Sequence, residues 1–420
     1  MSTVKRFKSS MSKKNSPWKS VRNVFNQIHL YAGLICGLIV VAVCFSGTIY
    51  VYNTEIKETF DSELYFVEVS GEKLSADEIK TTLEQELDKD VIQVFWTSEE
   101  DRSVQFTMKG AEEEGRGTTY YVDPYTAEIL GDNSVRTSTQ EFMSSMFSLH
   151  RWLLIDRIEE PIFEGMSNRE LGRFINGIAT TLFLLGVLTG IVIWFPNKLK
   201  SWKQGLKIKW SGNWKRVNHD LHNTLAFYSL ALLFIMSATG LFWSFQWYRE
   251  GWQKTWDTYQ TEAEREAEKN KPKPVFTSAT AHSLDHILAV SNEVVDYEGN
   301  TRITINKEVS KPISVRKYQT GIFAPAGSDN LVLSPEDLSV VEANLFSELP
   351  TRQRIGRSVK YLHTGEIFGK ATKFIWFLAC LVATSLPITG TLIWWNKRTK
   401  KSEKRRKSSA KVKERELEMA

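Results

Sequence analysis

Four long apolar runs constrain the fold of this chain more than any other feature of its sequence. Apart from His222, these runs contain no Asp, Glu, Lys, Arg or His, and they cover 30–51, 174–195, 221–248 and 374–395. Each is long enough to cross about 30 Å of hydrocarbon at about 1.5 Å per helical residue. The sequence therefore predicts four transmembrane helices.

Positive charge is concentrated in three segments that flank these runs. Segments 1–22, 196–218 and 396–420 hold 25 of the chain's 54 Lys and Arg residues, but only 4 of its 49 acidic residues. By the positive-inside rule these segments face the cytoplasm, and both termini are expected there. Contact with the lipid bilayer explains this basic excess, so we expect no nucleic-acid partner.

The runs and charges together divide the chain into nine parts. In order, we expect a basic cytoplasmic N-terminus (1–22), a span (23–52), an outer domain (53–170), a span (171–195) and a basic loop (196–218). These are followed by a span (219–248), a second outer domain (249–368), a span (369–395) and a basic tail (396–420). The first span is longer than a signal-peptide core and lacks an obvious Ala-x-Ala site, which favours an uncleaved anchor.

The two outer segments have the same order of elements. In the first, a capping-type Ser75 starts a helical pattern, alternating runs follow at 91–96, 104–108 and 118–122, and Asp123-Pro124 starts a turn. In the second, a helix is expected near 282–290 and strands near 301–305 and 313–317. Each segment is predicted to be a helix packed on a small antiparallel sheet.

Duplication of span, domain and span predicts two parallel repeats related by an axis along the membrane normal. Thr189-Gly190 in the second span aligns with Thr389-Gly390 in the fourth. Small residues let helix backbones approach closely, so the simplest interpretation is that these glycines only pack helices.

Four histidines match in pairs between the two halves. His29 lies 18 residues before Gly47, and His222 lies 18 residues before Gly240, while His150 and His363 each precede a later span. Imidazole is costly in lipid and often marks a functional site there. A bis-histidine haem needs two imidazoles on opposite faces of its ring, which facing helices of a bundle supply. The sequence predicts two haem b groups, one ligated by His29 and His222 and one by His150 and His363.

Three other histidines leave alternatives open. His219 lies one helical turn before His222 and is an alternative ligand to it, or a partner for a haem propionate. His282 and His286 have metal-ligand spacing, but no third ligand is evident nearby, and a solvated helix face is the simpler interpretation. Arginines beside the predicted ligands are candidates for neutralising propionates, with interfacial anchoring as the alternative; they are Arg22, Arg151, Arg216 and Arg357.

Several chemistries lack their sequence signatures. The three cysteines lie in the apolar runs, and there is no Cys-x-x-Cys-His for covalent haem. A Gly-x-Gly-x-x-Gly fingerprint and a P-loop are also missing, so no nucleotide or flavin site is expected in this chain. Electrons would then come from an external donor, either a flavoprotein or quinol.

Several motifs resemble those of PepSY-associated transmembrane proteins. They are Tyr-Val-Asp-Pro-Tyr-Thr at 121–126, Leu-His-Arg-Trp-Leu-Leu at 149–154, Asp-Leu-His-Asn at 220–223 and Leu-His-Thr-Gly at 362–365. The similarity runs from about Asn23 to Trp395. Two departures stand out: Ala127 replaces the Gly usual after the Asp-Pro-x-Thr turn, and the second domain lacks that turn.

The resemblance implies a membrane α-helical fold with four transmembrane helices in two parallel repeats and two α+β PepSY-like extracytoplasmic domains. It also implies haem-ligand roles for His29, His150, His222 and His363. Members include iron-regulated proteins of the bacterial inner (plasma) membrane, and some are haem-containing reductases of ferric siderophores. We therefore expect an oxidoreductase that passes electrons from the cytoplasmic or quinone side to a periplasmic ferric chelate.

Two other functions fit parts of the sequence. PepSY domains elsewhere accompany peptidases as inhibitory segments, so a non-catalytic membrane module that binds a peptidase or envelope partner is the alternative. A permease for the chelate is less favoured, because the uncharged spans offer no evident polar path.

Overall fold

Four membrane-length helices carry the fold of this protein. The computed structural model describes residues 17–195, 202–271, 274, 276, 282–306, 308, 310–324 and 327–418. Within them, the helices long and apolar enough to cross a membrane are α1 (Pro17–Tyr50), α6 (Asn168–Trp194), α8 (Trp214–Ser244) and α14 (Gly369–Glu418). The four expected spans are confirmed as candidates, and the last helix continues beyond the expected end at 395.

The contacts of the chain divide it into two compact units. A helical unit is formed by Met1–Val41, Ile178–Phe234 and Val382–Ala420. A sheet unit is formed by Ala42–Gly177 and Ile235–Leu381. Each of the four long helices contributes residues to both units.

The remaining elements belong almost entirely to the sheet unit. Its first segment contains α2 (Asn53–Phe60), α3 (Ser62–Tyr65), α4 (Ala76–Leu87), β1 (Asp90–Trp96), β2 (Val104–Lys109), β3 (Thr118–Val122), β4 (Ile129–Asp132), α5 (Ser138–Trp152) and η1 (Ile155–Arg157). Its second segment contains α9 (Gln246–Thr255), α10 (Glu262–Asn270), α11 (Leu284–Val294), β5 (Gly299–Thr304), β6 (Ile313–Gln319), β7 (Asp329–Leu333), β8 (Val340–Asn344), η3 (Phe346–Glu348), α12 (Thr351–Arg357) and α13 (Val359–Thr364). Helix α7 (Trp202–Gly205) lies in the helical unit.

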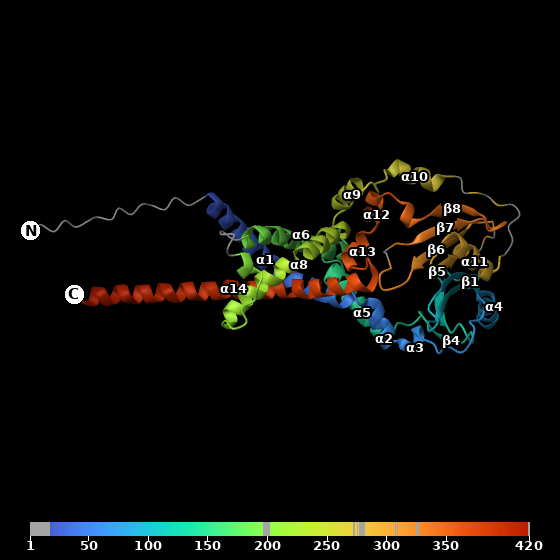
Figure 1. Ribbon diagram of the computed structural model, residues 1–420, viewed down its shortest axis with the longest axis horizontal. Coiled ribbons are helices and arrows are strands. Elements are labelled where there is room, and N and C mark those ends of the chain that lie inside the picture. The colour runs from blue at the N-terminus through green and yellow to red at the C-terminus, as the bar shows by residue number, and fades with distance from the viewer. Residues whose placement is uncertain are drawn as a thin grey trace, which may run out of the picture. The chain divides into compact units, whose positions relative to one another are not determined.

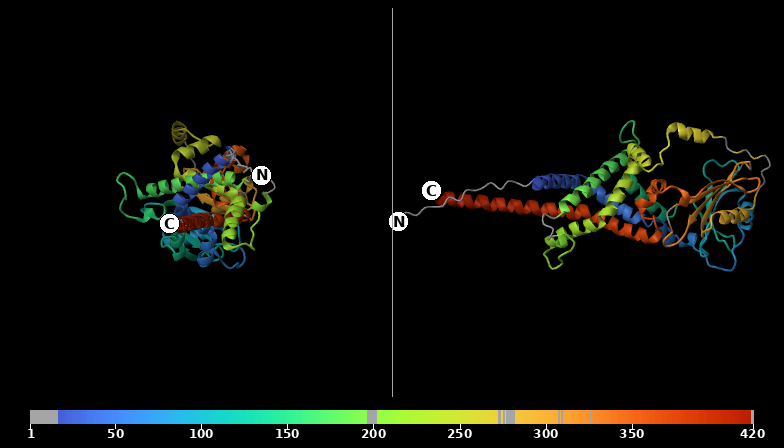
Figure 2. Two further views of the ribbon diagram at one scale, coloured as in Figure 1. Left: turned by 90° about the vertical axis from the view of Figure 1, so that its left-hand side faces the viewer. Right: turned by 45° about the horizontal axis from the view of Figure 1, so that its top comes forward.

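The two segments share one antiparallel sheet. Its strand order is β4-β3-β2-β1-β5-β6-β7-β8, so the first strand of each segment pairs with the other at the centre, with Val94 opposite Ile303. Figure 1 and the right-hand view of Figure 2 show the strands of the two segments side by side. The sequence predicts two separate small sheets, and their union depends on β1 and β5 meeting edge to edge.

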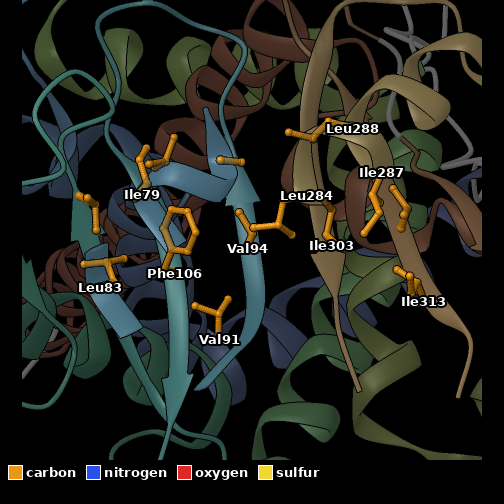
Figure 3. Close-up of a cluster of buried hydrophobic side chains, with 14 of the residues drawn as sticks. Ile79, Leu83, Val91, Val94, Phe106, Leu284, Ile287, Leu288, Ile303 and Ile313 are labelled. Carbon is orange, nitrogen blue, oxygen red and sulfur yellow. The ribbon is translucent and has the colours of Figure 1, made fainter. Parts of the chain in front are cut away.

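Helices α4 and α11 cover one face of this sheet with a single hydrophobic core. Ile79 and Leu83 of α4 pack with Val94 and Phe106, and the core continues into the second segment (Figure 3). Core residues alternate along β2 and β6 with residues on the opposite face, as the strand pleat requires. The expected helix at 75–87 is confirmed, including a capping box in which the Ser75 hydroxyl accepts from the Glu78 N–H.

Two aspartates join α4 and α11 through their N-termini. The Asp77 carboxylate of α4 accepts hydrogen bonds from the backbone N–H groups of Leu284 and Asp285, at 3.0 and 3.1 Å. The Asp285 carboxylate of α11 accepts from the N–H groups of Ala76 and Asp77, at 2.9 and 3.3 Å. Each aspartate therefore satisfies free N–H groups at the start of the other helix, where negative charge is also favoured.

The second segment contains a turn with the same backbone as the Asp123-Pro124 turn of the first. Ala127 donates to the Asp123 carbonyl at 2.9 Å, and Leu338 donates to the Ser334 carbonyl at 3.0 Å. Ala127 and Leu338 have φ angles of 61° and 59°. The expectation that the second domain lacks this turn is wrong for the backbone. Both residues occupy the left-handed region, which explains why Gly is usual at this position.

Replacing Asp77 with Ala should destabilise the sheet unit. The change leaves the first N–H groups of α11 without their acceptor, which costs about 1–2 kcal/mol for a lost N-terminal cap. We expect the thermal unfolding midpoint of the full chain in detergent, followed by circular dichroism, to fall by a few degrees. Glu86→Ala on the exposed side of α4 is the matched control and should leave the midpoint nearly unchanged. Equal midpoints for both variants would contradict the role of Asp77.

Candidate functional site

The four histidines singled out by the sequence lie in two pairs, one in each unit. In the helical unit, the ring centroids of His29 (α1) and His222 (α8) are 6.3 Å apart, with an angle of 88° between the rings. In the sheet unit, the centroids of His150 (α5) and His363 (α13) are 6.0 Å apart, at 54°. Each pair takes one imidazole from each half of the chain.

The Nδ1 atom of every one of these imidazoles is hydrogen-bonded to a neighbouring helix. His29 Nδ1 lies 3.0 Å from the Gly186 carbonyl oxygen and 3.1 Å from the Thr189 hydroxyl, both on α6. His222 Nδ1 lies 2.9 Å from the hydroxyl of Thr389 on α14. That hydroxyl donates its own proton to backbone carbonyls of α14, so it accepts from the imidazole.

The pair in the sheet unit is held in the same way. His150 Nδ1 lies 2.9 Å from the carbonyl oxygen of Val43 on α1. His363 Nδ1 lies 3.0 Å from the Met236 carbonyl oxygen and 3.1 Å from the Thr239 hydroxyl, both on α8. A carbonyl oxygen only accepts, so Nδ1 carries the proton in these rings. The Nε2 atom of a neutral ring then keeps its lone pair, which is the form that binds a metal ion.

Burial keeps His150 and His363 neutral. Burial lowers the pKa of His150, the Val43 carbonyl opposes this effect, and the positive charge of Arg151 lowers the pKa further. Burial, together with the charges of His150 and Arg151, lowers the pKa of His363 to about 3 against the opposing Met236 carbonyl. Both imidazoles are therefore unprotonated at neutral pH.

Glycines leave space for these imidazoles to approach the helix backbones. A Cβ added at Gly47 would lie 2.9 Å from His150 Cε1, and one added at Gly390 would lie 3.2 Å from His222 Cε1. At Gly190 the corresponding distance to His29 Cε1 is 3.7 Å. The glycines at 190 and 390, expected as helix-packing positions, both lie against imidazole rings.

The glycines have a fixed relation to the carbonyls that the imidazoles use. Three of those carbonyls belong to residues four positions before a glycine, at Val43 before Gly47, Gly186 before Gly190 and Met236 before Gly240, while His222 uses the hydroxyl of Thr389, which directly precedes Gly390. Residues i and i+4 are neighbours on a helix surface, so a side chain at i+4 would cover the carbonyl at i. The Ser-Gly and Thr-Gly pairs of the spans thus mark four places where a helix accepts a hydrogen bond from an imidazole.

Three arginines gather near His150. The charges of Arg173 and Arg249 act on Arg151, whose pKa is lowered first by burial and then by these two neighbours, with Tyr50 opposing. In the described part of the chain, none of the three forms an ion pair. Arg173 Nε and Trp152 Nε1 are buried without a hydrogen-bond partner. This cluster suits an anionic group that supplies carboxylate oxygens.

The other arginine candidates are placed differently. Arg22 donates from Nη2 to the Ile193 carbonyl at 2.5 Å, and Arg216 forms an ion pair with Asp220 at 2.8 Å. Arg357 is exposed at the end of α12. Sequence reasoning missed Arg173 and Arg249, since nothing in the pattern near either residue shows that they approach Arg151.

The remaining histidines do not join the pairs. His219 lies 3.6 Å from the Asp220 carboxylate and accepts or shares a hydrogen bond with the Asn223 amide. His282 Nε2 lies 2.8 Å from the Pro335 carbonyl oxygen, and His286 is exposed. Across the described residues, no group of three or more His, Cys, Asp or Glu side chains is arranged to hold a metal ion.

The sheet unit also contains a cavity of about 610 Å³. Its most buried charged lining residue is Lys317, which donates to the Asn292 side chain at 2.8 Å and the Val295 carbonyl at 2.7 Å. The ammonium also lies 5.1 Å from the centre of the Tyr297 ring. Neutral oxygens and an aromatic ring thus satisfy this buried charge, and none of the histidines lines the cavity.

The chain was compared with known protein families and with curated proteins. A family model described as the PepSY-associated TM region matches residues 26–397, which is most of the chain. No curated protein matches the sequence.

Adding a methyl group at Gly47 should displace His150. Overpacking costs about 1–3 kcal/mol, so we expect Gly47→Ala to lower the thermal unfolding midpoint of the full chain. Gly33→Ala on the same helix is the matched control, because nothing lies within 4 Å of the added Cβ. This control gains helix propensity of up to about 1 kcal/mol and should match or exceed the wild-type midpoint. A tolerated Gly47→Ala change would show that the ring does not need this space.

The neutral His363 should make stability depend on pH. The folded-state pKa lies below the ordinary value of 6.5, so the unfolded chain binds more protons as the pH falls. This stabilisation is complete above about pH 6.5 and is lost as the pH falls towards the folded-state pKa. We expect the wild-type unfolding midpoint to fall between about pH 7.5 and pH 5, and His363→Gln to reduce that fall. The exposed control His286→Gln should retain the wild-type pH dependence.

Proposed function

The chain belongs to the PepSY-associated transmembrane family, and from this premise we propose that it is a di-haem b electron-transfer protein of the bacterial inner membrane. Its termini would face the cytoplasm and its sheet unit the periplasm. The proposed activity is reduction of a ferric siderophore, with release of ferrous iron.

The separation of the paired imidazoles is the observation that carries this proposal. Two metal–nitrogen bonds of about 2 Å, plus roughly 1 Å from each nitrogen to its ring centre, place two axial imidazoles roughly 6 Å apart. The observed centroid distances are 6.3 and 6.0 Å. Each ring also presents an unprotonated Nε2, because its Nδ1 is bonded to a helix.

The surroundings of the second pair also fit a haem. Arg151, Arg173 and Arg249 offer guanidinium groups without carboxylate partners, and the buried Arg173 Nε lacks an acceptor that a propionate would supply. Trp243 packs against His363 with 5.3 Å between ring centroids and limits rotation of that imidazole. When bound, haem would supply an iron that changes its charge by one electron.

Residues of the chain would hold the two ligand sets rigid. The Nδ1 hydrogen bonds set the tautomer and orientation of each imidazole, and the Asn176 amide donates to the His150 carbonyl at 2.6 Å. Rigid ligands lower the reorganisation needed when the charge of a bound metal changes.

The duplication supports assignment of two parallel repeats with PepSY-like domains. Helices α4 and α11 each precede four strands, and the sheet order reads outward from β1 and β5 in the same sequence on both sides. The two aspartate caps are reciprocal. A twofold relation of this kind brings equivalent histidines together in pairs.

A flavoprotein or quinol is the proposed donor, and a ferric chelate is the proposed acceptor at the sheet unit. Ferrous iron has a lower charge than ferric iron and binds hard oxygen ligands less strongly. One electron per iron therefore suffices to weaken the chelate. On this proposal the protein is a haem-dependent oxidoreductase.

Absorption spectra of purified protein test the proposal. We expect a dithionite-sensitive Soret band and about two haems per chain, since each imidazole pair ligates one iron. His29→Ala and His363→Ala should each remove one centre and leave the other, as measured by haem content and electron paramagnetic resonance. His286→Ala, at an exposed position of α11, is the matched control and should retain both.

A colourless, iron-free preparation would overturn the haem assignment and favour the non-catalytic module that binds a peptidase or envelope partner. Full haem content in both the His29→Ala and His363→Ala variants would likewise contradict the ligand sets proposed here.

A further inference from the structure

Two arginines lie side by side on the sheet face opposite α4 and α11. Arg302 of β5 is directly paired with Arg316 of β6, while Phe95 and Asn330 flank them on the adjacent strands. Side chains of directly paired residues lie about 4.5–5.5 Å apart at Cβ, and like charges in that position are destabilising. Arg302 is partly buried and Arg316 is exposed, so an anion from solution can reach the pair and offset this repulsion.

The protein supplies no carboxylate to this pair. Among the described residues, neither Arg302 nor Arg316 forms an ion pair, and the Arg316 Nε donates instead to the Asn330 side-chain oxygen at 2.6 Å. The Arg302 Nε is buried and has no hydrogen-bond partner. The Arg302 guanidinium lies 5.1 Å from the centre of the Phe95 ring and 5.9 Å from that of Tyr318, which holds it flat against aromatic surface.

This arginine face lies near the helix that carries His363. Burial raises the pKa of Tyr361 on α13, the nearby Tyr318 and Glu366 raise it further, and Arg316 opposes them. Figure 1 shows α13 on the side of the sheet away from α4 and α11. His363 is two residues from Tyr361 on this short helix.

We propose that Arg302 and Arg316, with the rings of Phe95 and Tyr318, bind a negatively charged ferric chelate whose iron is held by catecholate or carboxylate oxygens. This inference rests on the proposed function and names the substrate class of its acceptor site. The paired guanidinium groups donate charge-assisted hydrogen bonds to anionic oxygens, and the aromatic rings provide flat surface for a catechol.

The charge of the chelate decides between substrate classes. Three singly charged hydroxamates neutralise ferric iron, whereas three doubly charged catecholates, or several carboxylates, leave a negative complex. Only the negative complex offsets the repulsion between Arg302 and Arg316. The site should therefore discriminate against a neutral trihydroxamate.

Binding of gallium chelates tests this site without requiring electron transfer. Gallium(III) has the charge of ferric iron but is not reduced under these conditions, so affinity for full-length protein in detergent is measured by isothermal titration calorimetry. We expect the gallium tricatecholate to bind more tightly than the neutral gallium trihydroxamate, and added salt to weaken only the former. Arg302→Gln and Arg316→Gln should each weaken tricatecholate binding by about 10- to 100-fold.

Three comparisons make the result specific. Arg116→Gln removes the same charge from an exposed loop between β2 and β3 and should bind as wild type does. Arg302→Lys keeps the charge and should retain most of the affinity, and the unfolding midpoint of each variant is compared with wild type. Equal affinity for the two chelates, or no loss in the Arg302→Gln/Arg316→Gln double variant, would overturn the inference. The inference would also be overturned if the double variant bound the chelate as wild type does but sedimented less with anionic lipid vesicles. That result would assign the arginines to lipid phosphate.

The two proposals fail in different ways. A colourless protein that still binds the gallium tricatecholate through these arginines refutes the haem assignment and leaves the anion site intact. A protein with two haems that binds both chelates equally refutes the anion site alone.

Discussion

The arrangement of this protein depends on one constraint, which is that an imidazole in apolar surroundings needs a partner for its N–H group. Three of the four paired histidines meet this need at a backbone carbonyl that lies four residues before a glycine, and His222 meets it at the Thr389 hydroxyl. The glycine removes the side chain that would cover the carbonyl, while a hydroxyl residue beside it adds a polar contact at three of the four positions. One local motif thus supports both the packing of the spans and the orientation of the rings.

Each imidazole pair takes one residue from each half of the chain, as the proposed duplication would require. The same relation that sets β1 against β5 brings Asp77 and Asp285 to each other's helix, and joins two small sheets over one core. When equivalent strands pair, the residues next to them are also equivalent, so one pairing accounts for several contacts. The histidine pairs, one in each unit, follow the same rule.

Uncompensated positive charge marks where anions belong in the sheet unit. Lys373 shows the contrast: it is buried at 5 % exposure, and its ammonium is paired with Glu55 at 2.9 Å and Glu366 at 3.2 Å. In the described part of the chain, Arg151, Arg173 and Arg249 near His150 form no ion pair, and neither do Arg302 and Arg316 on the sheet. Arg249 and Arg316 are exposed, whereas Arg173 and Arg302 each have a buried Nε without a hydrogen-bond partner, and these two buried nitrogens are the ones that an anionic ligand would satisfy.

The sequence alone determined the four spans, the helix at 75–87, the first strands of each segment and the identity of the paired histidines. These features are periodic or local, because lipid thickness, helical spacing and strand alternation leave their mark on consecutive residues. The tertiary structure decided the choice of His222 over His219 beside His29, and the approach of Arg173 and Arg249 to Arg151. It also joined the two sheets at β1 and β5. These outcomes depend on which surfaces meet when separate elements pack together, and no local pattern of side chains encodes that meeting.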